Sequence, residues 1–335
     1  MKLLGGNTNP ELWEKVADYL SAKMCNLDVA KFANGETQVI VRETVRQSDV
    51  YILQSGCGDV SVNDAVMELC ILAQACSTSS AQRVTAVLPY FPYSKQSKQK
   101  RRGTIAAKLV ADLLQVAGVS HILTLDLHHM QMQGFFGMPV DNVKCSPLLA
   151  DYILHQIPNG AKCVIAAKNA GASKRAAVIA KRLGCDFAMI FGEQTNAQGD
   201  GVIGEVYERD VVIVDDVIDG AESFVKAAQL FKDNGADNVY IIATHGILSG
   251  KCPEELQECD AIQRVVVTNT IPQRDHMARC PKLATIDCSD VLGEAVRRLH
   301  FDESLYAMYS PPVPATASPA RRRGARSRTT SACEN

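Results

Sequence analysis

The chain has 335 residues, of which 47% are apolar, and its formal net charge at pH 7 is −2. This length and apolar content suit two α/β domains, each with a core of its own. No apolar run approaches the roughly 20 residues of a membrane-spanning helix, so no membrane segment is expected.

The first half of the chain alternates between strand and helix patterns. Asn9-Pro10 predicts a helix start, with asparagine as the cap and proline as the first helical residue. Further elements are expected as strands at 50–54, 84–89 and 122–125 and as helices at 63–75 and 104–116. Such alternation is typical of a mainly parallel sheet flanked by helices.

Three polar segments interrupt this half. The first is a turn that contains Phe32, Asn34 and Glu36, and the second is a basic loop that begins with Lys95 and Gln96. The third follows the strand at 122–125 and supplies Asp126 and His128, with Asp141 some residues later. Taken alone, these segments are equally compatible with an ordinary turn, a solvated charged loop and a structural histidine.

The pattern restarts near residue 145 with a helix, a strand at 163–166, a helix and another strand. Residues 211–214 then form a β-branched run, which predicts a strand buried on both faces. Asp215 and Asp216 follow at its carboxyl end, where open α/β sheets bind ligands. Asp219 precedes a helix whose N–H groups could hold a phosphate. The alternative is that the first two carboxylates merely end a strand and Asp219 caps the helix.

The end of the chain differs from the rest in composition. Residues 311–335 are rich in Pro, Ser, Thr and Ala and predict a disordered basic tail. The tail carries five arginines and one glutamate, which is a net charge of +4 and leaves the body at −6. A body of that sign argues against specific nucleic-acid binding. The twelve cysteines show no zinc spacing, and with no signal peptide in sight we expect reduced thiols in the cytoplasm.

Taken together, these segments resemble the ribose-phosphate pyrophosphokinases, also called phosphoribosyl pyrophosphate synthetases. The resemblance implies two tandem phosphoribosyltransferase-like domains at 1–145 and 146–310, followed by the tail at 311–335. It implies that the turn with Phe32, Asn34 and Glu36 holds the adenine of ATP at the boundary with a neighbouring subunit. Lys95 and Gln96 would contact ATP as well.

The resemblance also implies metal and sugar sites. His128, Asp126 and Asp141 match segments that supply a Mg²⁺ ligand and contacts to the ATP phosphates. The ribose 5-phosphate loop is matched by a set of five residues in the second half: Asp215, Asp216, Asp219, Gly220 and Ser223. Mg²⁺ and ATP are therefore the expected cofactors if binding is retained.

Several positions depart from the pattern of the catalytic members. Gly192 and Gln194 replace the lysine and arginine that stabilise the transferring diphosphoryl group, so no catalytic residue is expected. Asn169 replaces the aspartate of a Pro-Asp-x-Gly motif, and a neutral amide is a poor ligand for Mg²⁺. Glu222 replaces a glycine of the sugar loop, where its charge is expected to repel a phosphate by about 4 kcal/mol.

These departures, with the short basic loop after Gln96, resemble the non-catalytic branch of the family, the phosphoribosyl pyrophosphate synthetase-associated proteins. The first hypothesis is a non-catalytic or strongly impaired homologue that assembles with catalytic subunits in homo- or hetero-oligomers and regulates them. The second is an active ribose-phosphate diphosphokinase that transfers the diphosphoryl group of Mg·ATP to ribose 5-phosphate. A third is a module that binds adenine nucleotide without turnover.

Overall fold

The computed structural model describes residues 1–58, 60–99, 101–192 and 201–308. In the first half, the strands are β1 (Lys2–Gly5), β2 (Leu27–Lys31), β3 (Thr37–Val41), β4 (Asp49–Leu53), β5 (Arg83–Leu88), β6 (His121–Leu125) and β7 (Val140–Val143). In the second half they are β8 (Val164–Ala167), β9 (Asp186–Phe191), β10 (Gly201–Ile203), β11 (Val211–Ile218), β12 (Val239–Gly246), β13 (Ile262–Thr268) and β14 (Leu283–Ile286).

Nine α-helices connect these strands in the described residues. They are α1 (Pro10–Tyr19), α2 (Val62–Thr78), α3 (Ala106–Val116), α4 (Ser146–Gln156), α5 (Ser173–Leu183), α6 (Glu222–Asp233), α7 (Cys252–Glu258), α8 (Arg274–Arg279) and α9 (Ser289–His300). Within these residues no helix combines the length and the apolar character that crossing a membrane requires.

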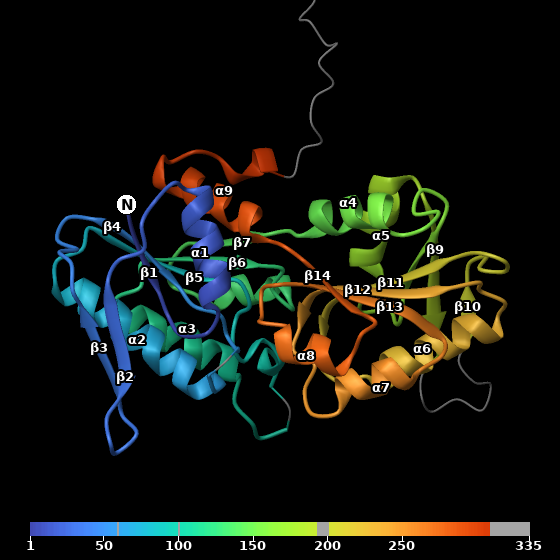
Figure 1. The fold of residues 1–335 in the computed structure, drawn as a ribbon, viewed down its shortest axis with the longest axis horizontal. Coiled ribbons are helices and arrows are strands. Elements are labelled where there is room, and N and C mark those ends of the chain that lie inside the picture. The colour runs from blue at the N-terminus through green and yellow to red at the C-terminus, as the bar shows by residue number, and fades with distance from the viewer. Residues whose placement is uncertain (59, 100, 193–200, 309–335) are drawn as a thin grey trace, which may run out of the picture.

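The strands form two large sheets, which lie side by side in Figure 1. The first has the order β1-β4-β5-β6-β7, and all of its pairs are parallel. The second has the order β10-β9-β8-β11-β12-β13-β14 and is parallel except for the edge pair β10 and β9. Strands β2 and β3 form a separate antiparallel hairpin at the outer side of the first sheet. The predicted fold class, parallel sheets flanked by helices, is confirmed.

The β-branched run at 211–214 is buried on both faces, as the sequence predicts. Val211 and Ile213 pack into a core with α6 and α7, whereas Val212 and Val214 pack into a different core with α4 and α5. Successive side chains of a strand point to opposite faces of the sheet. A strand with helices on both sides therefore needs apolar residues on both faces, and the run at 211–214 provides them before β11 continues through Asp215 and Asp216 to Ile218.

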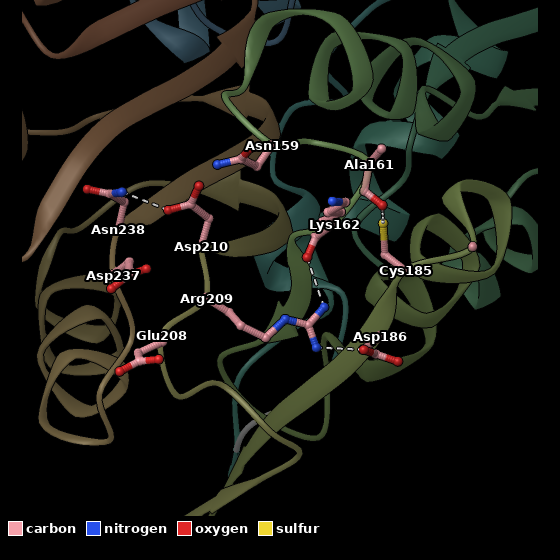
Figure 2. A pocket seen from close by; sticks show the side chains of 11 residues that line it. Asn159, Ala161, Lys162, Cys185, Asp186, Glu208, Arg209, Asp210, Asp237 and Asn238 are labelled. Carbon is pink, nitrogen blue, oxygen red and sulfur yellow. Dashed lines mark hydrogen bonds and ion pairs between the residues drawn. The ribbon is translucent and has the colours of Figure 1, made fainter.

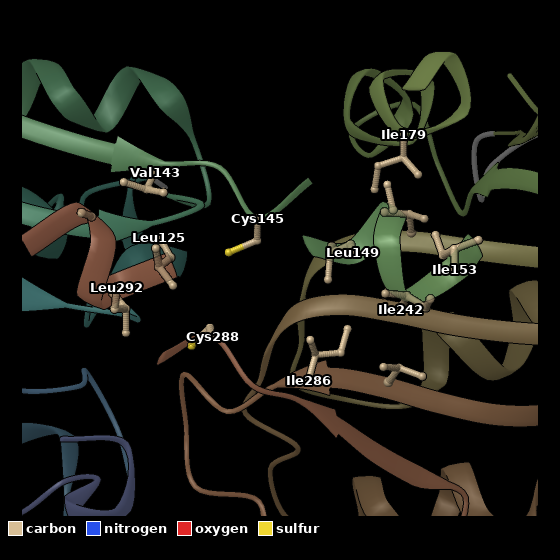
Figure 3. Close-up of a cluster of buried hydrophobic side chains, with 14 of the residues drawn as sticks. Leu125, Val143, Cys145, Leu149, Ile153, Ile179, Ile242, Ile286, Cys288 and Leu292 are labelled. Atoms are coloured by element: carbon tan, nitrogen blue, oxygen red, sulfur yellow. The ribbon is translucent and has the colours of Figure 1, made fainter. Parts of the chain in front are cut away.

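The core on the α4 and α5 side continues into the first half of the chain. Figure 3 shows Leu125 from β6 and Leu292 from α9 in one cluster with Ile242 and Ile286 from the second sheet. Helix α9, near the end of the described chain, lies beside α1 near its start (Figure 1). The two sheets are thus joined by packed apolar side chains and not only by a linker.

Buried hydrogen bonds also join the halves where the strands end. The fully buried ring of His245 contacts the Leu125 carbonyl oxygen through Nε2 at 3.1 Å. Thr244 Oγ1 donates to Asp126 Oδ2 at 2.8 Å. Burial lowers the pKa of His245, so the ring is neutral and its two nitrogens serve as one donor and one acceptor. The carboxyl ends of β6 and β12 are therefore held close together, and the polar loops that follow the strands meet there.

Candidate functional site

A polar cavity of about 400 Å³ lies at the carboxyl ends of the strands, where the two halves meet. The first half contributes Lys95, His128 and His129 to its wall. The second half contributes the end of β11 and the segments that follow β8 and β11, which together include Lys168, Asn169, Arg175, Asp215, Asp216, Asp219, Gly220 and Ser223. This is the place at which open α/β sheets bind ligands.

Strand register explains why Asp215 faces the loop after β8. Ala166 of β8 pairs with Ile213 of β11, and β8 ends one residue later at Ala167. Lys168 therefore stands level with Asp215. The Lys168 Nζ atom lies 2.9 Å from Asp215 Oδ2, and Arg175 Nη1 from α5 lies 3.4 Å from Asp215 Oδ1.

Asp216 is held by side chains from both halves. Its Oδ2 is 2.6 Å from His128 Nδ1, and its Oδ1 is 3.0 Å from Arg175 Nη1. Burial alone would raise the pKa of Asp216, but the hydrogen bond from His128 and the charge of Arg175 outweigh burial and hold that pKa well below its usual range. Asp216 is therefore ionised at neutral pH, and it ties the β6 loop to β11.

Asp215 behaves differently although it is the next residue. Burial raises the pKa of Asp215, and the adjacent Asp216 adds to this effect against the opposing charge of Lys168. Two buried carboxylates side by side repel each other, so their pKa values are driven apart. Lys168 and Arg175 lie against the pair and favour its charged form.

Asp219 forms a second bridge between the halves. Lys95 from the loop after β5 donates to Asp219 Oδ2, and Ser249 donates to Oδ1. Burial opposes these bonds, but the hydrogen bonds from Lys95 and Ser249 prevail and lower the pKa of Asp219. Lys95 is thereby placed in the cavity, but its charge is directed at the protein's own carboxylate.

The three residues matched to metal contacts are not all brought together: Asp126 and His128 line one small pocket, and Asp141 lies apart. Asp126 accepts hydrogen bonds from the Cys145 amide at 3.0 Å and from Thr244, and its φ of 38° lies in the sparsely populated left-handed region. Asp141 lies near the amino end of β7, where its Oδ2 is 2.7 Å from His121 Nε2. Of this set, only His128 lines the cavity.

The residues present do not fit a Mg²⁺ ion in this arrangement. In the part of the chain that the structure describes, no three His, Cys, Asp or Glu side chains converge as metal ligands would. The Asp215 and Asp216 carboxylates are engaged by Lys168, Arg175 and His128. Asn169 Oδ1 accepts from the Ala172 amide at 3.1 Å, at the start of α5. The substitution at 169 thus serves a local turn.

The nucleotide-binding set is also dispersed. Phe32, Asn34 and Glu36 are exposed at the tip of the β2–β3 hairpin, and none of them lines the cavity. Phe32 is 50% exposed, which is high for an aromatic side chain. Gln96 is exposed beside Lys95 but does not line the cavity either. Within one copy of the chain, the hairpin and the cavity are separate features.

The five residues matched to the sugar loop gather at the cavity, but Glu222 does not. Gly220 and Ser223 line it together with the three aspartates, and α6 begins beside them with no side-chain cap among the described residues. Glu222, however, is not part of the wall. Its side chain is 80% exposed, and its Oε1 lies 2.7 Å from Lys226 Nζ one turn along α6. The expectation that Glu222 repels a phosphate in the cavity is therefore corrected.

Of the two positions at which the family's lysine and arginine are replaced, only Gly192 lies in the described residues. Gly192 directly follows β9, has a φ of 147° and does not line the cavity. Gln194 lies outside the described residues, and so do the tail residues 311–335.

Lys168 and Arg175 were not expected from the sequence to be central to the site. The sequence contains a signal for this pairing: these two cationic residues follow the buried strand at 163–166, and two carboxylates follow the run at 211–214. Only the β8–β11 register shows that they meet.

A larger cavity of about 610 Å³ lies at the opposite, amino ends of the second sheet's strands (Figure 2). Two pairs of its polar side chains bond to each other: Arg209 Nη1 lies 2.6 Å from Asp186 Oδ2, and Asn238 Nδ2 donates to Asp210 Oδ1 at 2.7 Å. None of the predicted site residues lines it. We therefore take the smaller cavity at the carboxyl ends as the candidate site.

Comparison with known proteins supports the resemblance seen in the sequence. A family model described as the N-terminal domain of ribose phosphate pyrophosphokinase matches residues 1–118. A second model, the phosphoribosyl synthetase-associated domain, matches residues 201–310. A crystal structure of phosphoribosylpyrophosphate synthetase from Mycobacterium smegmatis superposes with a TM-score of 0.83 at 35% identity, covering 90% of this chain and 99% of that one. The predicted phosphoribosyltransferase-like fold is thereby confirmed.

Similar curated proteins carry names of both kinds. Ribose-phosphate pyrophosphokinase 2 of Schizosaccharomyces pombe is 45% identical and covers 92% of this chain and 97% of its own length. Phosphoribosyl pyrophosphate synthase-associated protein 1 of Homo sapiens is 42% identical, with 89% and 92% covered. The chain therefore belongs to the family of ribose-phosphate pyrophosphokinases and phosphoribosyl pyrophosphate synthase-associated proteins.

Proposed function

We propose that the chain is a non-catalytic family member that assembles with catalytic synthetase subunits and regulates them. The observation that carries this proposal is the state of the cavity: its two buried carboxylates are neutralised by the chain's own Lys168 and Arg175. A site built for a cation-bound substrate would need free anionic oxygens. Relatives named as associated proteins, at 40–42% identity, support the same proposal.

The replacement of two cationic residues supports a low rate of phosphoryl transfer. In phosphoryl transfer, the charge that develops on the transferring group must be met by fixed cations or metal ions. The family's lysine and arginine are replaced by Gly192 and Gln194, and Lys95 is paired with Asp219. Because removal of a single such donor costs roughly 10²–10³ in rate, loss of both leaves little room for turnover.

The exposed tip of the β2–β3 hairpin supports assembly with a neighbouring subunit. Phe32 is half exposed at the end of a protruding hairpin (Figure 1). Exposed aromatic side chains are enriched at protein interfaces. We propose that Phe32, Asn34 and Glu36 lie at the contact with a neighbouring subunit, in the cytoplasm, where the free thiols of the described cysteines stay reduced.

Co-expression with a catalytic synthetase subunit from the same cell tests this function. We expect one hetero-oligomer by size-exclusion chromatography with light scattering, and a specific activity per catalytic subunit that differs at least about twofold from the homo-oligomer. Phe32→Ser should weaken assembly by about 1–3 kcal/mol, whereas Phe301→Ser, at a residue that is 64% exposed, serves as the matched control. Separate elution of the two proteins at micromolar concentration, with unchanged activity, would contradict the proposal.

A second candidate is an active ribose-phosphate diphosphokinase. It is favoured by the retained sugar-loop residues Asp215, Asp216, Asp219 and Ser223 at the cavity. The 45% identity to a relative named as a pyrophosphokinase also favours it. Under this alternative, Mg²⁺ and ATP would have to displace Lys168 and Arg175 from the carboxylates. Turnover by the purified chain separates the two candidates.

A further inference from the structure

Lys168 has an unusual environment for a lysine. It stands where the family's Pro-Asp-x-Gly motif begins with proline, and its side chain is only 13% exposed. Its Nζ atom lies 2.9 Å from Asp215 Oδ2 and 3.2 Å from Ser223 Oγ, and it sits over the Phe224 ring at 3.6 Å from the centroid. The ammonium group thus has a carboxylate, a hydroxyl and an aromatic face around it.

Two of these partners take N–H donors of the ammonium, and the third, the ring, attracts its charge. An ammonium has three N–H donors and no acceptor, and the face of an aromatic ring attracts a cation within about 6 Å. A ligand at this group would therefore compete with a carboxylate, a hydroxyl and an aromatic face that already hold it. The lysine is therefore a satisfied part of the wall and not a poised binding group.

Two of the partners come from opposite ends of the sugar loop. Asp215 belongs to its carboxylate end, and Ser223 lies at the start of α6, where a phosphate would meet the helix. Because Lys168 bonds to both, its ammonium lies in the space between the carboxylate and the helix terminus. A sugar phosphate that contacts both ends would have to occupy the same space.

The charges around the group balance without any ligand. Asp215 and Asp216 are 7% and 4% exposed, and Lys168 and Arg175 provide two fixed cations against them. A unit charge about 4 Å away contributes roughly 4 kcal/mol at a surface-like dielectric. The Lys168 ammonium already neutralises the negative charge of Asp215, and it would repel a divalent cation that approached this carboxylate.

We propose that Lys168 is a built-in occupant of the cavity: its tethered ammonium takes the place of a cation at Asp215 and fills the ribose end of the site. This inference rests on the proposed non-catalytic function and gives it a specific cause. Glu222 does not block the site, because its exposed side chain is not part of the cavity wall. In the alternative role for Lys168, a phosphate-binding residue, a phosphate would have to compete with Asp215 and Ser223 for the ammonium.

Titration with Mn²⁺, followed by water-proton relaxation, tests the proposal on the full chain. Wild type should bind Mn²⁺ only weakly, whereas Lys168→Met and Lys168→Gln should each bind it about tenfold more tightly or better because the competing charge is gone. Lys168→Arg, which keeps the charge, and Lys181→Met, which removes an exposed lysine of α5, should match wild type. Adding Asp215→Asn to Lys168→Met should abolish the gain.

Three results would overturn the proposal. One is equal Mn²⁺ affinity in wild type and both neutral variants. Another is sub-millimolar Mn²⁺ binding by wild type that Asp215→Asn removes, which decides the matter even if the neutral variants fail to fold. The third is tighter ribose 5-phosphate binding by wild type than by Lys168→Met, which would make the lysine a phosphate ligand. Product formation, assayed on the same wild-type sample, reports separately on the proposed function.

Discussion

Replacement of Asp216 by asparagine is expected to lower the free energy of unfolding by about 3 kcal/mol at pH 7. Asp216 is 4% exposed, and it bonds His128 from the first half and Arg175 from the second. Removal of its charge leaves Arg175 with only the longer contact to Asp215 and removes a link between the halves. Urea denaturation of the purified chain measures the change.

The pH dependence of this loss distinguishes a charge effect from a packing effect. Because the pKa of Asp216 is lower in the folded chain than its usual value, its stabilisation is present above the unfolded pKa, about 3.9, and is lost as the pH falls through the folded pKa. The difference between wild type and variant should therefore shrink between pH 5 and about pH 3. Asp151→Asn, at a side chain that is 72% exposed, should change stability by less than about 1 kcal/mol. A pH-independent loss would contradict the account of Asp216.

Replacement of Phe224 by alanine is expected to cost about 4 kcal/mol of folding free energy. The ring is 1% exposed, packs in the core beneath α6, and supports the Lys168 ammonium on its face. The variant opens a cavity in the core and also frees the lysine from one of its three partners. Thermal and urea denaturation measure the total loss.

Phe224→Leu separates the two contributions. Leucine retains most of the apolar volume, so packing should cost less than about 1.5 kcal/mol, and the cation–π contact contributes about 1 kcal/mol more. Phe301→Ala, at an exposed phenylalanine, is the control and should stay within about 0.5 kcal/mol. A Phe224→Ala variant as stable as wild type would show that this ring does not support the wall of the site.

The fold was predictable because its signals are local. The β-branched run at 211–214 predicts a strand buried on both faces, and β11 is that strand. The helix expected at 63–75 is α2, which extends from Val62 to Thr78, and the strand expected at 163–166 is β8, from Val164 to Ala167. Hydrophobic periodicity decides such elements within a few residues.

The sequence could place a residue in the candidate site only where that residue lies at the carboxyl end of a predicted strand. Asp215 and Asp216 come directly after the β-branched run, so their place toward the carboxyl end of the sheet follows from the chain itself, although β11 continues through them to Ile218. Asp141 could not be placed in this way, because its distance from His128 depends on how far β7 runs beside β6. Glu222 could not be placed because the first turn of a helix exposes one side and buries the other, and the helix phase decides which.

The role of Lys168 needed long-range information. Its partner Asp215 is 47 positions away in the sequence, and the contact depends on β8 ending one residue after its last pair with β11. The packing of α9 against α1 is a contact of the same kind, because α1 ends at Tyr19 and α9 begins only at Ser289. Neither contact follows from composition or local spacing.

Product formation by the purified chain tests the central claim most directly. The full chain, free of any catalytic relative, is incubated with Mg·ATP and ribose 5-phosphate, and phosphoribosyl pyrophosphate is quantified against a catalytic synthetase from the same preparation scheme. With both loop cations replaced and the carboxylates neutralised internally, the account predicts a rate at least about 10³-fold below that enzyme. A rate within about tenfold of it would contradict the account.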